Sequence, residues 1–139
     1  MCLIFKTPVV LNTNFSERAV VNTATAAWVQ SPEPLVQRRL IERDGGEVAR
    51  ATSIVRYQAG ASFKPHRPYG GEEIFVVEGV FEDEHGRYPA GTWLRNPHMS
   101  QHQPFSREGC TIFVKTGHLP VLQNTASMPG SHPENDRAG

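Results

Sequence analysis

The chain has 139 residues, of which 38% are hydrophobic and 20% charged, which is enough for one compact domain with one core. Fourteen basic residues balance fourteen acidic ones, so the bulk charge that draws proteins to nucleic acid or to an acidic membrane is missing. We therefore expect neither nucleic acid nor a membrane among its partners.

The apolar runs and the cysteines indicate a cytoplasmic protein. No apolar run approaches the roughly 20 residues of a membrane-spanning helix, and Lys6 interrupts the first run before a signal-peptide core forms. The two cysteines, Cys2 and Cys110, lie far apart in sequence and favour neither a disulfide framework nor a cysteine-based zinc site. A metal ion would have to be held by histidine and carboxylate side chains.

Short β-branched and aromatic runs between frequent prolines and glycines predict an all-β fold. Eight such runs are typical of a sandwich or a barrel. In chain order, the expected strands are residues 20–27, 36–42, 49–57, 62–65, 73–78, 80–83, 92–95 and 111–115.

Turn residues divide these runs. Asp44–Gly46 and Asp83–Gly86 have the composition of hairpin turns, and Ser31–Pro34 contains two prolines that cannot donate to a strand ladder. Residues 124–139 offer almost nothing to bury, so we expect a disordered tail there. This leaves a single domain within residues 1–123.

The segment from Glu72 to Glu78 is apolar on both faces of its expected strand. Ile74 and Val76 share a face with Glu72, so we expect them to line a pocket beside that carboxylate. Phe75 and Val77 make the opposite face apolar as well, and such a strand needs cover on both sides. Another strand layer or a second subunit could supply that cover, and the second possibility leads us to expect a homodimer.

Three residues stand out as candidate metal ligands: His66, Glu72 and His102. A tight turn at Tyr69–Gly71 can bring His66 and Glu72 together, and a later strand can add His102. Two imidazoles and one carboxylate suit a divalent transition metal, with Fe(II), Zn(II), Ni(II), Mn(II) and Cu(II) all open.

Two spaced motifs resemble those of the cupin superfamily. The first runs from Gly60 through His66 and Glu72 to Gly79, and the second runs from Gly91 through Pro97 to His102. More narrowly, the chain resembles ChrR-like cupin domains and acetylacetone-cleaving dioxygenases over about residues 28–116. The segments that carry this likeness are residues 46–53, 71–74, 78–84, 88–91 and 95–97.

The resemblance implies a cupin double-stranded β-helix, a jelly-roll barrel, over about residues 28–116 with an N-terminal arm over 1–27. It also implies a metal held by His66, Glu72 and His102, and a non-haem, metal-dependent oxygenase acting on a small dicarbonyl-like substrate. Two alternatives are a ChrR-like module that senses a metal or ligand, and a metal-free cupin that binds a small molecule. No catalytic residue is assigned beyond the ligands.

The sequence departs from the cupin motifs at two positions near these ligands. Pro68 stands where the family has a second histidine, and Met99 replaces the glycine of the second motif. The turn before His102 must therefore avoid a positive φ or carry strain. His98 or Tyr69 could approach the position that Pro68 leaves, although a loop histidine and a rim aromatic are the simpler interpretations.

Overall fold

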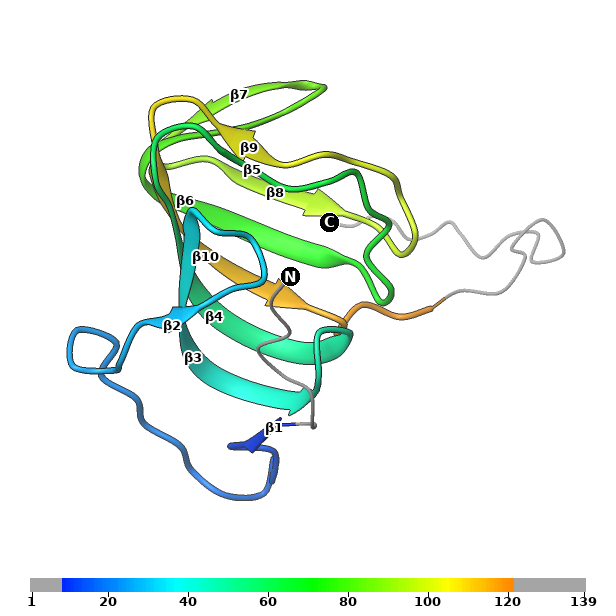
Figure 1. The fold of residues 1–139 in the computed structure, drawn as a ribbon. Coiled ribbons are helices and arrows are strands. Elements are labelled where there is room, and N and C mark those ends of the chain that lie inside the picture. Colours follow the sequence, from blue (N-terminus) through cyan, green and yellow to red (C-terminus); the bar gives the residue numbers. More distant parts are fainter. Residues whose placement is uncertain (1–8, 122–139) are drawn as a thin grey trace, which may run out of the picture.

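The structure is a computed structural model that describes residues 9–121, and these residues form an antiparallel β fold without helices (Figure 1). No helix among them is long and apolar enough to cross a membrane. The predicted tail at 124–139 lies outside the described residues, as do residues 1–8 of the expected arm at 1–27. The ten strands are β1 (Val9–Leu11), β2 (Val29–Gln30), β3 (Val36–Gly45), β4 (Ala49–Tyr57), β5 (Ala61–Ser62), β6 (Glu72–Asp83), β7 (Gly86–Pro89), β8 (Trp93–Asn96), β9 (Phe105–Ser106) and β10 (Cys110–Thr116).

The strands curl into a half-barrel in which sequence neighbours are often not spatial neighbours. The order is β1-β3-β4-β10-β6-β9-β5, with β2 paired to β3 and with β7 and β8 paired to β6. In Figure 1, β3, β4, β10, β6 and β8 form one curved layer, and β5, β7 and β9 lie across from its lower strands. This arrangement confirms the predicted all-β, single-domain cupin fold.

Strand β6 connects the two parts of the sheet, and its continuity corrects the prediction of two strands at 73–78 and 80–83. Its first half pairs with β8 and β10, and its second half pairs with β7 and β9. Gly79 allows the strand to continue because its φ is 76° and a Cβ there would collide with the backbone of Gly109 and Cys110.

The core lies inside the curled sheet. It consists of buried residues from β3, β4, β5, β6 and β10, namely Val36, Val55, Tyr57, Ala61, Ile74, Val76, Phe81, Cys110, Ile112 and Val114. On β4, alternate residues 51, 53, 55 and 57 are buried, as the strand periodicity predicts. Thr52, on the opposite face, is buried too, because its hydroxyl bonds to Glu42 and Lys115 across the sheet.

Two of the expected strands are wrong or too long. Residues 20–27 form turns, in which the Asn22 side chain accepts a hydrogen bond from the backbone N–H of Ala24 at 2.9 Å. Residues 62–65 contribute only to the two-residue β5. The short strands β1, β2, β7 and β9 were not predicted, because two to four residues carry too little periodicity to recognise.

Candidate metal centre

Backbone pairing brings His66 and His102 together. The N–H of His66 donates to the carbonyl of His102 at 3.0 Å, and the reverse bond is 3.1 Å long, so the two residues form an isolated antiparallel bridge. Their rings lie edge to face with centroids 4.7 Å apart. The chain thus juxtaposes two histidines that are far apart in sequence.

Glu72 reaches the same place as the first residue of β6, directly after a tight turn. The turn closes through a bond from the N–H of Gly71 to the carbonyl of Pro68 at 3.0 Å. Gly71 has a φ of 70°, and a Cβ there would collide with Leu119 and with the backbone of Asn96. Glycine at this position therefore sets where Glu72 begins its strand.

One nitrogen or oxygen atom from each of His66, Glu72 and His102 can be chosen so that all three lie within 4.8 Å of one another. Nε2 of His102 is 2.6 Å from Oε2 of Glu72, and the amide of Asn96 donates to that oxygen at 3.0 Å. Two metal bonds of about 2.1 Å span at most about 4.2 Å, so small side-chain shifts suffice to bring the three donors around one ion.

The ring nitrogens of His102 fit a metal ligand. The side chain is 1% exposed, and neither Nδ1 nor Nε2 makes a hydrogen bond of normal geometry within residues 9–121. A buried polar atom without a hydrogen bond is costly, and coordination would remove that cost. Together with His66 and Glu72, it gives a nitrogen and oxygen donor set that suits a divalent transition metal.

Burial and the neighbouring ionisable groups shift the pKa of both imidazoles. Burial lowers the pKa of His66, and neighbouring His102 lowers it further. Burial also lowers the pKa of His102, but the contact with the Glu72 carboxylate outweighs it, so that this pKa is raised. The two histidines therefore differ in how readily each becomes the neutral base that binds a metal.

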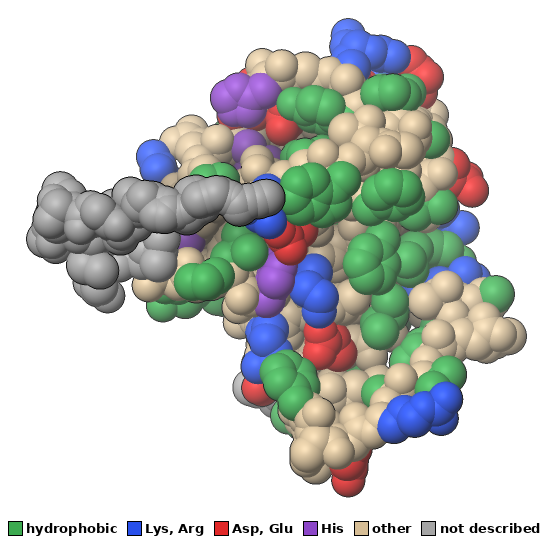
Figure 2. Space-filling view, turned by 180° about the vertical axis from the view of Figure 1, so that it is seen from behind, with side chains coloured by type: hydrophobic (Ala, Val, Ile, Leu, Met, Phe, Trp, Pro, Cys, Tyr) green, Lys and Arg blue, Asp and Glu red, His purple; other side chains and the backbone are tan. Residues whose placement is uncertain are grey.

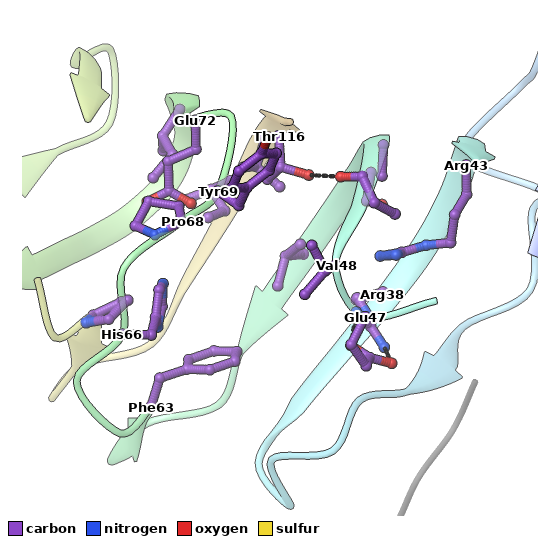
Figure 3. A pocket seen from close by; sticks show the side chains of 18 of the residues that line it. Arg38, Arg43, Glu47, Val48, Phe63, His66, Pro68, Tyr69, Glu72 and Thr116 are labelled. Atoms are coloured by element: carbon purple, nitrogen blue, oxygen red, sulfur yellow. Dashed lines mark hydrogen bonds and ion pairs between the residues drawn. The ribbon is translucent and has the colours of Figure 1, made fainter. Parts of the chain in front are cut away.

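A cavity of about 350 Å³ lies beside these donors (Figure 3). Its apolar walls include Phe63, Ile74, Ile112 and Val114, and both His66 and Glu72 line it. The second expected pocket residue, Val76, is fully buried in the core and is not among the lining residues.

Figure 3 shows His66, Pro68 and Glu72 on one side of the cavity and Arg38 and Arg43 on the other. Sequence reasoning missed these arginines, which β3 brings to the cavity from 23 or more positions earlier in the chain. It also missed Asn96 as a partner of Glu72. The two are directly paired across β8 and β6, a register that the sequence alone does not reveal.

The two other candidates near the position of Pro68 hold a loop in place. His98 accepts a hydrogen bond on Nδ1 from the N–H of Gly70 at 2.8 Å, and its ring packs edge to face against Tyr69. Tyr69 lines the cavity rim and is 60% exposed. Neither residue belongs to the donor cluster, which agrees with the simpler interpretations of both.

Met99 carries the strain that the missing glycine predicts. Its φ is 63°, in the left-handed region that favours glycine. The N–H of Met99 donates to the carbonyl of Pro68 at 2.9 Å. This bond ties the loop before His102 to the loop before Glu72, so the strained residue helps to hold the two ligand-bearing segments together.

Solved structures with the same fold come from several functional classes. A chain in the crystal structure of Rhodobacter sphaeroides SigE in complex with the anti-sigma ChrR is 22% identical, with a TM-score of 0.55, and the alignment covers 68% of this chain and 50% of that one. This protein thus spans about half the length of that chain. An acetylacetone dioxygenase from Acinetobacter johnsonii is 20% identical, with a TM-score of 0.58 and 72% of each chain covered.

A third structure, the polyketide cyclase RemF from Streptomyces resistomycificus, is 15% identical, with a TM-score of 0.59, and the alignment covers 84% of this chain and 95% of that one. At these identities the likeness shows the fold. No curated protein matches the chain. The model of the ChrR cupin-like domain matches residues 16–120. This match covers most of the chain, and the protein therefore belongs to the ChrR cupin-like family.

Proposed function

We propose that this protein binds a divalent transition metal through His66, Glu72 and His102 and uses it as a small-molecule oxygenase. The observation that carries the proposal is the convergence of the three donor atoms within 4.8 Å, two of them from residues that line a cavity, His66 and Glu72. The buried ring nitrogens of His102 support it. Fe(II), Zn(II) and Ni(II) all suit this donor set, and the oxygenase role requires Fe(II) or another metal that supports oxygen chemistry.

The residues of this chain would orient the metal ligands and keep water away from the substrate. Asn96 fixes one oxygen of Glu72 through a 3.0 Å hydrogen bond, and the backbone bridge fixes both histidines. The apolar walls at Ile74 and Val114 would exclude water from a bound organic substrate. Fe(II), which His66, Glu72 and His102 would hold, would supply the redox chemistry for the reaction of a dicarbonyl-like substrate with dioxygen.

Pro68 reduces the number of side chains that could bind the metal. It lines the cavity where the family motif has a histidine, and it carries no ligating side-chain atom. Two histidines and one carboxylate are the donor set of another large group of non-haem iron oxygenases. The loss of one family ligand is thus compatible with oxygen chemistry.

Oxygen uptake tests the oxygenase proposal. The protein is loaded with Fe(II) under anaerobic conditions and mixed with aerated pentane-2,4-dione and related small dicarbonyls in an oxygen electrode. We expect substrate-dependent uptake that disappears in His102→Ala. Stoichiometric metal binding without uptake for any dicarbonyl would contradict the oxygenase and favour the sensing module, and a protein without metal affinity would favour the metal-free binder.

We also propose a homodimer formed through the outer face of the sheet. Phe75 is paired with Trp93 on β8 and with Phe113 on β10, and these three side chains are 42%, 54% and 37% exposed. Val77 extends the row and is 46% exposed. Figure 2 shows hydrophobic side chains gathered on the face turned away in Figure 1. A second copy placed by a two-fold axis presents the same row and covers it.

We propose the cytoplasm as the place of action, in keeping with the thiol that the structure describes. Cys110 is free and buried, and burial raises its pKa to about 11. Such a thiol is a poor nucleophile and packs as a small hydrophobic residue. It therefore does not need to form a disulfide bond for stability.

A further inference from the structure

We infer that the hydroxyl of Tyr57 binds the organic ligand of the cavity by donating a hydrogen bond to a neutral oxygen, the carbonyl oxygen of a ketone. This inference deepens the proposed function and rests on it for the presence of a substrate beside the metal donors. Tyr57 is the last residue of the row by which β4 lines the cavity, after Ala51, Ser53 and Val55. Its hydroxyl thereby helps to decide which small molecules the cavity accepts.

The hydroxyl of Tyr57 is available to a ligand. The residue is 5% exposed, and its oxygen makes no hydrogen bond within residues 9–121. Unlike the unpaired ring nitrogens of His102, this oxygen is not closed to solvent. Because Tyr57 lines the cavity, the open part of its surface faces that cavity. A ligand there can accept the phenolic hydrogen.

Aromatic neighbours hold the ring of Tyr57 in place. Its centroid is 5.6 Å from that of Phe63 and 5.7 Å from that of Phe81, and the contact with Phe81 is edge to face at 87°. Both phenylalanines also line the cavity. A hydroxyl on a packed ring loses little conformational freedom when it binds a ligand, so its hydrogen bond adds to affinity.

The same packing connects Tyr57 with the metal donors. The ring of Phe63 lies 6.1 Å from that of His66, and Figure 3 shows both residues along one side of the cavity. Burial raises the pKa of Tyr57, and among its ionisable neighbours Glu72 adds most to this rise. The phenol therefore stays protonated and serves as a hydrogen-bond donor inside the cavity that Glu72 also lines.

The walls near the hydroxyl specify the rest of the ligand. Val55, Phe63, Phe81 and Ile112 line the cavity with apolar side chains. The volume of about 350 Å³ lies at the small end of the range for ligand sites, about 300–1,000 Å³. A ketone with a compact apolar body matches these walls, and its oxygen gives Tyr57 an acceptor.

The test compares acetophenone with 2-phenylpropene, in which a methylene group replaces the carbonyl oxygen and the shape is nearly the same. Dissociation constants come from NMR titrations of the full-length, EDTA-treated wild type and Tyr57→Phe. The ratio of the two constants should shift about fivefold against acetophenone in the variant, as expected for the loss of one hydrogen bond. The difference in hydrophobicity between the probes cancels, because it is the same in both proteins. An unchanged ratio, or a wild type that does not bind acetophenone up to its solubility limit, overturns the inference.

A second tyrosine supplies the matched control. Tyr88→Phe removes the same atom from a residue that does not line the cavity and whose hydroxyl donates to Asp83 at 3.0 Å. It should keep the wild-type ratio, and an equal shift there would contradict the inference. Tyr57→Phe should unfold at the same urea concentration as the wild type or at a higher one, because the lost hydroxyl has no partner within residues 9–121. A clear loss of stability would assign the hydroxyl to the fold and overturn its role in binding.

Repeating the titrations with Zn(II)-loaded protein separates this inference from the metal proposal. The effect of Tyr57→Phe should be present with and without the metal, because the hydrogen bond does not involve the three donors. A protein that binds no metal but shows this effect refutes only the metal site. A protein that binds metal and shows no such effect refutes only the role of Tyr57.

Discussion

Nε2 of His102 lies 2.6 Å from Oε2 of Glu72, and both side chains are buried. Three elements create this contact: the bridge between His66 and His102, the turn that starts β6, and the hydrogen bond from Asn96. A buried contact of this kind between an imidazole and a carboxylate either holds a proton or shares a metal ion. Because a proton and a metal ion compete for this contact, metal binding depends on pH.

Metal affinity should fall as the pH falls. Each imidazole must be neutral to bind, and protons compete with the metal at each ligand. The raised pKa of His102 means that this competition begins above the ordinary histidine value of about 6.5. Zn(II) titrations between pH 5 and 8 should show roughly a tenfold loss of affinity per pH unit below that pKa, and a steeper loss once His66 is protonated as well. Affinity that stays flat over this range would argue against histidine ligands.

Replacing Met99 by glycine should stabilise the protein. The left-handed conformation costs an L-residue about 1–2 kcal/mol, while the extra freedom of unfolded glycine costs about 0.5–1 kcal/mol. With a φ of 63° at Met99, we expect a net gain of about 0.5–1 kcal/mol in the free energy of unfolding, measured in urea. Met99→Ala keeps the strain and serves as the matched control. If the glycine variant were the less stable of the two, the strain argument would be wrong.

The pairing of Glu82 should contribute stability that depends on pH. Its side chain is 1% exposed and accepts bonds from the backbone and the guanidinium of Arg107. The guanidinium bonds, which outweigh the effect of burial, lower the pKa of Glu82 below its ordinary 4.5. The stabilisation is therefore complete above the unfolded-state value and is lost as the pH falls through the lower folded-state value.

Glu82→Gln should accordingly cost about 1–2 kcal/mol at pH 7, and the difference from wild type should shrink below about pH 4. Thermal unfolding at several pH values measures both effects. Glu108→Gln is the control, because Glu108 is 57% exposed in its ion pair with Arg87 and such pairs contribute little. An equal effect of both variants, or a Glu82→Gln effect that does not change with pH, would contradict this account.

The proposed dimer depends on the aromatic row of the outer face. Multi-angle light scattering at micromolar concentration should give twice the chain mass for the wild type, and Phe75→Glu should give a monomer, since a buried unpaired charge is costly. Val20→Glu is the matched control, because Val20 is 74% exposed in a turn region away from this row. A monomeric wild type, or an equal loss in the control, would rule out this interface.

The long strands of the fold follow from the sequence because their alternation is strong. Residues 49–57 were predicted with the bounds that β4 has, and the inward set from Ala51 to Tyr57 is buried. The strand predicted at 20–27 failed because the side chains of Asn22 and Thr25 bond to nearby backbone groups, which β propensity does not report. The break predicted within β6 failed because glycine can bend a strand without ending it.

The candidate site was predictable in part. The spacing of the motifs singled out His66, Glu72 and His102, whose donor atoms the fold brings together. Arg38 and Arg43 were not predictable as cavity residues, because simple alternation puts an even and an odd position of one strand on opposite faces, and β3 has a register shift between Leu40 and Glu42 that the sequence does not reveal. Asn96 depends on cross-strand register, which a single sequence does not specify.

The metal content of purified protein tests the central claim most directly. Elemental analysis should find about one transition-metal ion per chain in the wild type, and far less in His66→Ala and His102→Ala, while both variants unfold cooperatively on heating. His98→Ala is the matched control, since His98 binds the N–H of Gly70 outside the donor cluster, and it should retain its metal. Equal metal content in all four proteins would contradict the ligand assignment.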